Sequence, residues 1–345
     1  MSKTIEKKHP GLFDYNVRME RLMESEPPLE RLDKRIDWEL FRSDLETLVK
    51  KEARGPGGRP RHDVVMMFKV LVLQRYYNLS DEQTEFQIND RLSFQRFLGL
   101  TLADDVPDEK TIWLFREEIG KGVRSLFDRF DGHLKAKGLV GKEGKIIDAS
   151  FVDVPRQRNS RDENELIKAG AVPVEFGKNG HKLSQKDTDA RWTKKGDEKH
   201  YGYKDHVKAQ TKTKLIEDYV VTDASVHDSQ ATEELTKKGD GELHADSAYR
   251  SEDIEKVLKA KEIKSQVHER AYRNKPLTDE QKEENKKKSK VRVRIEHIFG
   301  HMTMSMRDGL KMRFIGLKRN VVGIGLLNMV YNMARYEQIM RLQLA

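Results

Sequence analysis

The sequence predicts a mixed α/β fold in two parts, a helical region followed by a sheet with flanking helices. Two observations lead to this class. Apolar residues recur at helical spacing through residues 63–120, with turn residues between the segments. From residue 145 onward, short apolar runs typical of strands alternate with helical segments. We therefore expect a helical domain at 1–135 and an α/β domain at 140–345, as the length of 345 residues allows.

The composition indicates a polyanionic partner. Charged residues make up 36% of the chain and the net charge is +8. Such an excess favours nucleic acid over membrane, although ordinary solubility charge gives the same balance. The chain has no cysteine, which excludes disulfides, thiolate metal sites and cysteine nucleophiles. It also lacks a membrane-spanning apolar run and a signal-peptide core, so we expect a soluble, cytoplasmic protein without a membrane partner.

The helical region is expected to hold an arm and a set of short helices. Residues 1–30 are polar and contain prolines, which predicts an extended arm. A helix is expected over 36–48, with Asp37 as its N-cap. Further helices are expected over Val64–Tyr76, from the N-cap Ser80 to Asp90, over Leu92–Leu98 before Gly99, and after Pro107. This pattern is typical of a helix-turn-helix unit that reads DNA, and equally of a plain helical bundle.

Between these helices, residues 50–62 form a basic linker rich in glycine and proline. Five basic side chains and one acidic side chain lie in it. Its segment Gly58-Arg59-Pro60 resembles the core of an AT-hook, whose arginines enter the minor groove, so Arg59 and Arg61 are candidate DNA-binding residues. The alternative is a solvated basic loop.

The α/β region is predicted to begin with a strand buried on both faces, residues 145–154. After it we expect an extended lysine-rich loop over 155–200 and a core-facing helix over 322–340, for which a partner-binding face is the alternative. Between these, strands are expected at 200–211, 215–223, 241–249 and 262–267, and helices at 229–238, at 252–260 and around Glu296. This order of strands and helices is that of a ribonuclease-H-like sheet.

Three acidic residues are candidate metal ligands. Asp148 lies in the apolar strand, where a carboxylate costs several kcal/mol unless it is paired or binds a cation. Asp246 lies at the end of another apolar strand, and Glu296 follows Arg292 by four residues on one helix face. Three converging carboxylates suit Mg²⁺, and two such ions catalyse in-line phosphoryl transfer. Structural, salt-bridged carboxylates are the more common alternative.

Several blocks resemble, in order, those of bacterial insertion-sequence transposases with a DDE triad, the insertion-sequence-five type most closely. The resemblance covers about residues 29–340, and it is specific because the blocks agree jointly. They are Leu32–Trp38, Pro107–Thr111, Ile147–Ser150, Tyr201–Lys204, Val226–Ser229, Ala245–Tyr249 and Arg292–His297.

The resemblance implies that Asp148, Asp246 and Glu296 form the catalytic and metal-binding triad, with two Mg²⁺ ions for which Mn²⁺ can substitute. The last motif of the family also has a tyrosine three residues before the arginine and a basic residue seven after the glutamate. Here those positions hold Ser289 and Thr303. The nearest basic substitutes are Lys290 and Arg307.

Basic residues cluster just before Glu296 and predict contacts with DNA phosphates. A disordered lysine-rich loop is the alternative. Lysines within 178–199 could extend this surface, and Trp192 there is a candidate for stacking on an unpaired base. A zinc site at His297 and His301 is a weaker alternative to packed histidines. The candidate DNA-binding residues in this part of the chain are Lys287, Lys288, Lys290, Arg292, Arg294, Tyr203 and Lys204.

The resemblance therefore implies a DNA transposase that binds the terminal inverted repeats of its own element. Its triad would cleave each end to a 3′-hydroxyl and transfer that end to target DNA. A homodimer is the natural paired-end assembly, working in the bacterial cytoplasm and associated with the nucleoid when bound to DNA. Two alternatives are a metal-dependent nuclease that cuts without joining and a DNA-binding regulator whose acidic residues are structural.

Overall fold

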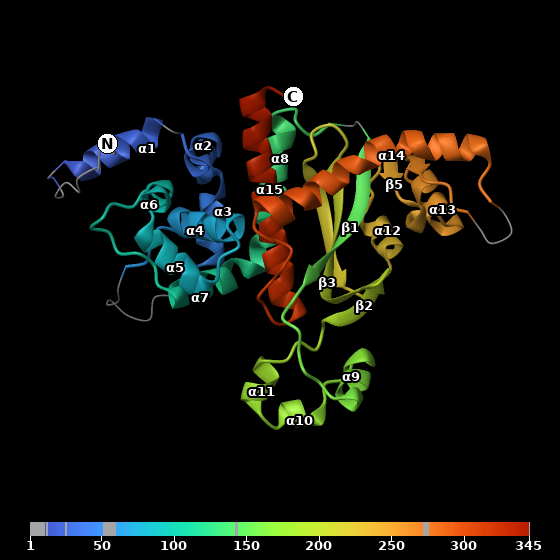
Figure 1. The fold of residues 1–345 in the computed structure, drawn as a ribbon, viewed down its shortest axis with the longest axis horizontal. Helices are drawn as coiled ribbons and strands as arrows, with labels where there is room; N and C mark the ends of the chain where they lie inside the picture. The colour runs from blue at the N-terminus through green and yellow to red at the C-terminus, as the bar shows by residue number, and fades with distance from the viewer. Residues whose placement is uncertain are drawn as a thin grey trace, which may run out of the picture.

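The computed structural model describes residues 11, 13–24, 26–50, 60–141, 144–271 and 276–344. The predicted fold class is confirmed, because a mixed sheet with flanking helices follows a helical N-terminal region. Helix α15 (Leu317–Leu342) stands between the helical region and the sheet (Figure 1). Within the described part of the chain, no helix combines the length and the apolar character needed to cross a membrane.

The helical region is built from short helices joined by tight turns. The extended arm predicted over 1–30 is wrong for residues 14–24 and 28–30, which are helical, while residues 1–10 lie outside the described residues. Pro28 takes the first position of a helix, where its missing N–H costs nothing. The elements are α1 (Asp14–Glu24), α2 (Pro28–Arg35), η1 (Trp38–Phe41), α3 (Arg42–Leu48), α4 (Val64–Tyr76), α5 (Asp81–Asp90), α6 (Leu92–Leu98), α7 (Glu109–Ile119), η2 (Gly120–Gly122) and α8 (Val123–Ala136).

Local capping explains where these helices begin and end. The Ser80 side chain accepts a hydrogen bond from the Gln83 amide at 3.1 Å and starts α5. Gly99, with φ of 74°, ends α6 in the left-handed conformation. Both were predicted. Asp37 occupies the predicted N-cap position before η1, but its side chain makes no capping hydrogen bond.

Six strands form one mixed sheet in the order β2-β3-β1-β5-β6, with β4 also paired to β3. The ladders β1–β3, β2–β3 and β3–β4 are antiparallel, whereas β1–β5 and β5–β6 are parallel. All the predicted strands are present. They are β1 (Lys145–Asp153), β3 (Glu198–Gln210), β4 (Ile216–Asp223), β5 (Glu242–Ala245) and β6 (Lys264–Val267), to which the structure adds β2 (Arg191–Lys195).

The segment expected to be an extended loop, 155–200, is instead structured. It contains α9 (Arg161–Lys168), α10 (Val174–Gly177), α11 (Gly180–Ser184) and β2. Helices α10 and α11, of four and five residues, are too short to show an apolar period, which is why the sequence pattern missed them. The segment is tied down by Asp187, which is 1% exposed and accepts hydrogen bonds from the Tyr203 hydroxyl and the Gly316 amide, both at 2.8 Å.

The remaining helices flank the sheet. The helix predicted over 229–238 is shorter and partly 3₁₀, while those around 252–260, Glu296 and 322–340 are confirmed. They are η3 (Asp228–Ala231), α12 (Thr232–Leu235), η4 (Ser247–Tyr249), α13 (Glu252–Ala260), α14 (Asp279–Gly300), the π-helical turn η5 (His301–Ser305) and α15.

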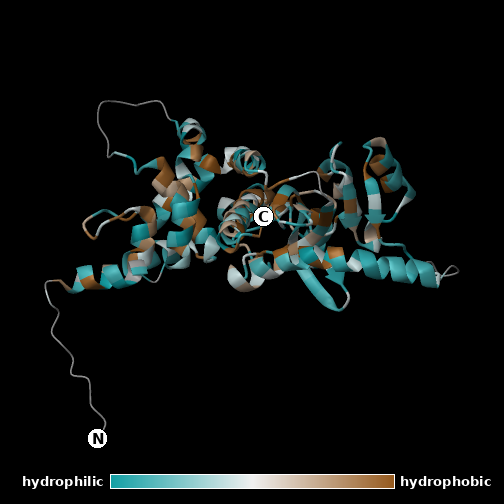
Figure 2. Cartoon of the chain, turned by 90° about the horizontal axis from the view of Figure 1, so that it is seen from above, coloured by the Kyte–Doolittle hydropathy of each residue, from teal (hydrophilic) through white to brown (hydrophobic). Residues whose placement is uncertain are grey.

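The two faces of the sheet belong to different hydrophobic cores. Ile146 packs into the large core with α15, whereas its neighbour Ile147 packs into a second core with α12 and α13. The alternation of side chains along a strand explains this division. Figure 2 shows α15 end-on amid hydrophobic residues, while most of α14 is hydrophilic. The large core runs continuously from α2 through α15 to the sheet; the division into two domains stays a prediction.

Candidate active site

Asp148 lies on β1, and Asp246 directly follows the neighbouring parallel strand β5. The ladder between β1 and β5 pairs Ile146 with His244, and the same register continued by two residues would bring Asp148 level with Asp246. Adjacent strands are about 4.8 Å apart, and residues two apart leave a strand on the same face. The two carboxylates therefore share one face of the sheet at the carboxyl end of β5, where ligands of α/β sheets bind.

Local hydrogen bonds orient both carboxylates. The Ala149 amide donates to Asp148 at 2.9 Å, and the Ala248 amide donates to Asp246 at 2.8 Å, where Asp246 caps η4. Each carboxylate keeps further lone pairs for other partners.

Helix α14 brings the third acidic residue to this face through an arginine. Arg292 lies 3.2 Å from Asp148 with one terminal nitrogen and 3.2 Å from Glu296 with the other. Arg292 and Glu296 are four residues apart and share a helix face. Arg292 is thus a positive side chain of the kind expected beside Asp148. Its guanidinium group joins Asp148 directly to Glu296, two of the three predicted triad members.

Burial gives Asp148 an unusual electrostatic state. Loss of solvent raises the pKa of its carboxyl to about 6, although the Ala149 amide and Arg292 both act to lower it. The negative charge of Asp246 adds to the upward shift. One arginine therefore only partly offsets the concentration of negative charge at this face.

Tyr249, which was not a candidate site residue, is buried in the second core and lies near enough to these acids for their charge to act on it. It is 1% exposed, and its hydroxyl has no hydrogen-bond partner within the described part of the chain. Burial first, and then the charges of Asp148, Asp228 and Asp246, raise the pKa of Tyr249 well above its usual value. Its position in the block Ala245–Tyr249 is the only sequence signal that could have identified it.

The chemistry of these side chains fits a hard divalent cation. The carboxylates of Asp148, Asp246 and Glu296 are the oxygen donors that Mg²⁺ prefers, and the buried Tyr249 hydroxyl has no partner within the described residues. With Arg292 between Asp148 and Glu296, the described residues contain no group of three acidic, histidine or cysteine side chains arranged to hold a metal ion.

Helix α14 has an exposed basic face on the side of the helix away from Arg292 and Glu296. Lys287, Lys290 and Arg294 are exposed and follow one another at three- and four-residue spacing, which places them on one side of the helix. Arg294 also donates a hydrogen bond to the Thr211 carbonyl at 2.7 Å. This face could meet a polyanion without any rearrangement of the core.

Three of the predicted DNA-binding side chains instead turn inward. Tyr203 is fully buried and donates to Asp187. Lys204 is 8% exposed and binds the Val226 carbonyl and Asp228, both at 2.7 Å. Lys288 is also 8% exposed and donates to the Val267 carbonyl at 3.1 Å. Their polar atoms already have partners within the fold, so DNA contact by these three side chains stays a prediction that this arrangement does not favour.

The remaining predicted residues are more scattered. Arg61 is exposed and donates to the Val49 carbonyl, while Arg59 and most of the basic linker lie outside the described residues. Trp192 is 46% exposed but packs beside Tyr201 at 4.9 Å between ring centres. Within 178–199, Lys182 binds Glu163, and Lys186 binds Asn159 and the Arg158 carbonyl, so these two lysines have partners within the fold.

The two histidines of α14 and η5 have other partners. Lys214 Nζ lies 2.7 Å from His297 Nδ1, and His301 packs edge-on against Tyr331. The alternative zinc site does not form among the residues that the structure describes.

Ser289 and Thr303 stand where the last motif of the transposase family has a tyrosine and a basic residue, and both side chains bond to carbonyls of the preceding helical turn. Ser289 donates to the Asn285 carbonyl at 2.9 Å, and Thr303 donates to the Phe299 carbonyl at 2.9 Å. Of the two basic substitutes, Lys290 is exposed on α14, whereas Arg307 lies over the Tyr77 ring at 5.4 Å. Lys290 is thus the one on the same helix as Glu296.

Comparison with known families covers both parts of the chain. Residues 17–118 match the family described as Transposase domain (DUF772), and residues 140–333 match the family described as Transposase DDE domain. No solved structure gives a significant match. The second match alone spans more than half of the chain and contains all three predicted triad residues. The chain therefore belongs to the DDE transposases of insertion sequences.

Proposed function

We propose that this transposase binds the terminal inverted repeats of its own element and performs metal-dependent strand cleavage and strand transfer with Asp148, Asp246 and Glu296. The single observation that carries the proposal is that Arg292 joins Asp148 to Glu296 at a point where the charge of Asp246 also acts on Asp148. The assembly would be a homodimer that holds two ends and a target duplex, in the bacterial cytoplasm and on the nucleoid.

The three carboxylates would hold Mg²⁺, or Mn²⁺ in its place. When bound, these ions supply an activated water and neutralise charge at the attacked phosphate. Because Asp148 is largely buried, few water molecules compete for its charge, which strengthens its attraction for a cation. Tyr249, buried in the second core, would contribute a hydroxyl that has no partner within the described residues.

Arg292 has the geometry to exchange partners when DNA arrives. Its planar guanidinium matches a phosphate as well as it matches a carboxylate. A phosphodiester that competes for Arg292 would free Asp148 and Glu296, which Arg292 now joins. In this proposal Arg292 positions DNA and controls the availability of the two acidic residues.

The basic face of Lys287, Lys290 and Arg294 would bind the DNA backbone along α14, around the helix from Glu296. Exposure on one side of α14 and the absence of any acidic residue between Lys286 and Arg294 support this path. Arg61, and Arg59 beyond the described residues, would add contacts from the linker. Tyr203, Lys204 and Lys288 have no part in this interface.

One observation favours a second function, that of a DNA-binding regulator. The ion pairs that Arg292 makes with Asp148 and Glu296 are those of structural carboxylates. A regulator would bind the repeats but would cleave nothing.

Cleavage of a labelled duplex that carries the repeat of the element tests these functions. Wild type should nick the repeat terminus in Mg²⁺, and Glu296→Gln should bind the duplex but not cut it. Glu280→Gln is the matched control, since Glu280 is exposed in the first turn of the same helix. Binding without cleavage by wild type would contradict the proposed catalysis and favour the regulator.

A further inference from the structure

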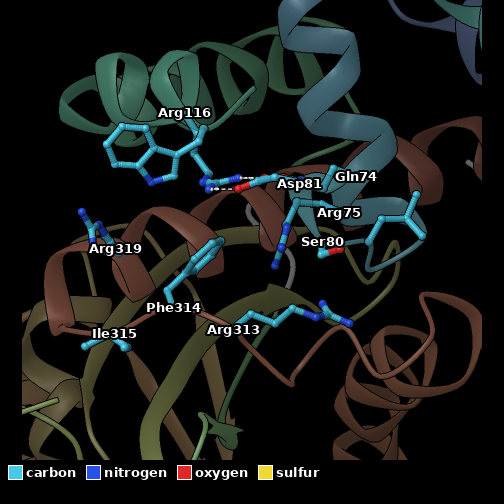
Figure 3. A pocket seen from close by; sticks show the side chains of 11 residues that line it. Gln74, Arg75, Ser80, Asp81, Arg116, Arg313, Phe314, Ile315 and Arg319 are labelled. Atoms are coloured by element: carbon cyan, nitrogen blue, oxygen red, sulfur yellow. Dashed lines mark hydrogen bonds and ion pairs between the residues drawn. The ribbon is translucent and has the colours of Figure 1, made fainter. Parts of the chain in front are cut away.

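A basic pocket lies where the helical region meets the segment that leads into α15, away from the three acids (Figure 3). Its volume is about 230 Å³. A water molecule accounts for about 30 Å³ in the liquid, so the pocket has room for a polyatomic ligand. Arg75 and Arg116 come from α4 and α7, whereas Arg313 and Arg319 come from the other region. A ligand here would touch both parts of the chain.

Positive charge exceeds negative charge in this pocket. Arg116 makes a paired contact with Asp81, with one bond of 2.7 Å, and Arg319 lies 3.0 Å from Glu117. Arg313 has a neutral partner, since it donates to the Asn78 side chain at 2.8 Å. Within the described part of the chain, the four guanidinium groups of the pocket are thus paired with only two carboxylates, those of Asp81 and Glu117.

Arg75 is the least satisfied of the four. The Arg75 side chain is 3% exposed. Its Nε has no hydrogen-bond partner among the described residues, and its Nη1 donates to the Met312 sulfur at 3.0 Å. A thioether is a weak acceptor. Figure 3 shows the side chain between the Arg116–Asp81 pair and Arg313. Burial, and then the nearby Arg116 and Arg313, lower the pKa of Arg75 to about 9.

The surroundings hold these guanidinium groups ready for an anion. The Phe314 ring lies 5.2 Å from the Arg75 guanidinium carbon and 4.8 Å from that of Arg116. Stacking against an aromatic ring leaves the N–H edges of a guanidinium available. Ser80, at the start of α5, also lines the pocket, and the positive end of a helix dipole favours an anion there. Guanidinium groups bind phosphate oxygens in a paired geometry.

We propose that this pocket binds a phosphate group through Arg75 and Arg313 and so ties the helical region to the segment before α15. The phosphate belongs either to the backbone of bound DNA or to a free phosphate compound. The pocket itself does not depend on the triad, and only the DNA source rests on the proposed function.

Thermal unfolding in inorganic phosphate, against sodium chloride of equal ionic strength, tests the pocket. Wild type should show a saturable rise in Tm, about 4 °C at a phosphate concentration one hundred times Kd. Arg75→Met and Arg313→Gln should lose the rise, and Arg341→Gln should keep it, because exposed Arg341 pairs with Glu337 outside the pocket. A wild type without the rise, or variants that retain it, would overturn the proposal.

A second arm identifies the source of the phosphate. The slope of log affinity for repeat DNA against log salt should become shallower by about 0.9 in Arg313→Gln if the pocket holds a backbone phosphate. An unchanged slope would overturn the DNA source and assign the pocket to a free phosphate. Asp246→Asn should keep the phosphate-dependent rise in Tm, so that a failure of the proposed catalysis is distinguishable from a failure of the pocket.

Discussion

Asp148 and Asp205 are two buried carboxyl groups on the neighbouring strands β1 and β3. Asp148 has a positively charged partner, whereas Asp205 has a neutral one. Asp205 pairs across the ladder with Ser150, two residues from Asp148, so both lie on the same face of the sheet. Asp148 meets Arg292 and the charge of Asp246, and its pKa rises to about 6. Asp205 is fully buried against Asn328, without a cation within the described residues, and burial raises its pKa to about 7.

The difference shows that a raised pKa does not by itself mark a functional acid. Asp205 Oδ2 and Asn328 Oδ1 both lack a partner within the described part of the chain. One proton on Asp205 would let these two oxygens bond each other, so Asp205 can satisfy itself as a neutral group. Asp148 lies beside other acids at a strand end and needs positive charge, which is typical of a site for an external ligand.

The largest expected effect is on DNA cleavage, which should depend on Asp148 and not on Asp205. Asp148→Asn should reduce cleavage of repeat DNA by about a thousandfold or more, because a lost metal ligand removes several kcal/mol of charge stabilisation. Duplex binding and Tm should change little. The measurement is the single-turnover cleavage rate, with the highly exposed Asp253 changed to Asn as the control. Cleavage that survives in Asp148→Asn would remove the distinction between Asp148 and Asp205.

The next effect concerns stability against pH. The folded pKa of Asp205, about 7, lies above its ordinary value of 3.8. Its contribution to the free energy of unfolding is therefore complete below about pH 4 and is lost as pH rises through 7, in total roughly 4 kcal/mol. Asp205→Asn should remove this slope and be more stable than wild type at pH 8. Urea unfolding at pH 5 and 8 measures the difference, and an equal slope in both proteins would contradict a neutral Asp205.

A smaller effect tests the need of Asp148 for positive charge. Arg292→Gln leaves a partly buried carboxylate unpaired and should lower the free energy of unfolding at pH 8 by about 2 kcal/mol. In an Asp148→Asn background the same change should cost less. A double-mutant cycle of urea unfolding measures this coupling. A coupling energy of zero would mean that Arg292 does not neutralise Asp148.

The smallest effect compares the outer and inner lysines of α14. Changing Lys287 and Lys290 to Gln should make the salt slope of DNA binding shallower by about 2, since each contact contributes about 0.9. Lys288→Met should leave the slope unchanged, because Lys288 is buried against the Val267 carbonyl. Filter binding at several salt concentrations measures both. The reverse result would place the DNA on the other side of α14.

Local patterns predicted much of this fold. The caps at Ser80 and Gly99 and the apolar period of α15 depend on residues close in sequence, and the structure confirms them. The inward orientation of Lys204 and Lys288 depends on acceptors at Asp228 and Val267, which are distant in sequence and invisible to local pattern. Tertiary contacts therefore decided which basic residues remain exposed.

The candidate site shows the same limit. The sequence identified Asp148, Asp246 and Arg292, and the register of β1 and β5, continued by two residues, would bring the two aspartates level. It did not identify Tyr249, because an unpartnered buried hydroxyl is a property of packing. Nor did it find the arginine pocket, whose members come from α4, α7 and the segment before α15.

Mn²⁺ titration followed by the loss of free-ion paramagnetic resonance signal tests the central claim most directly, namely that the acids around Asp148 form a cation site. Wild type with repeat DNA should bind Mn²⁺ saturably, and Asp246→Asn should lose that binding. Asp205→Asn should bind as wild type does. Equal binding by all three proteins, or none by wild type, would contradict the claim.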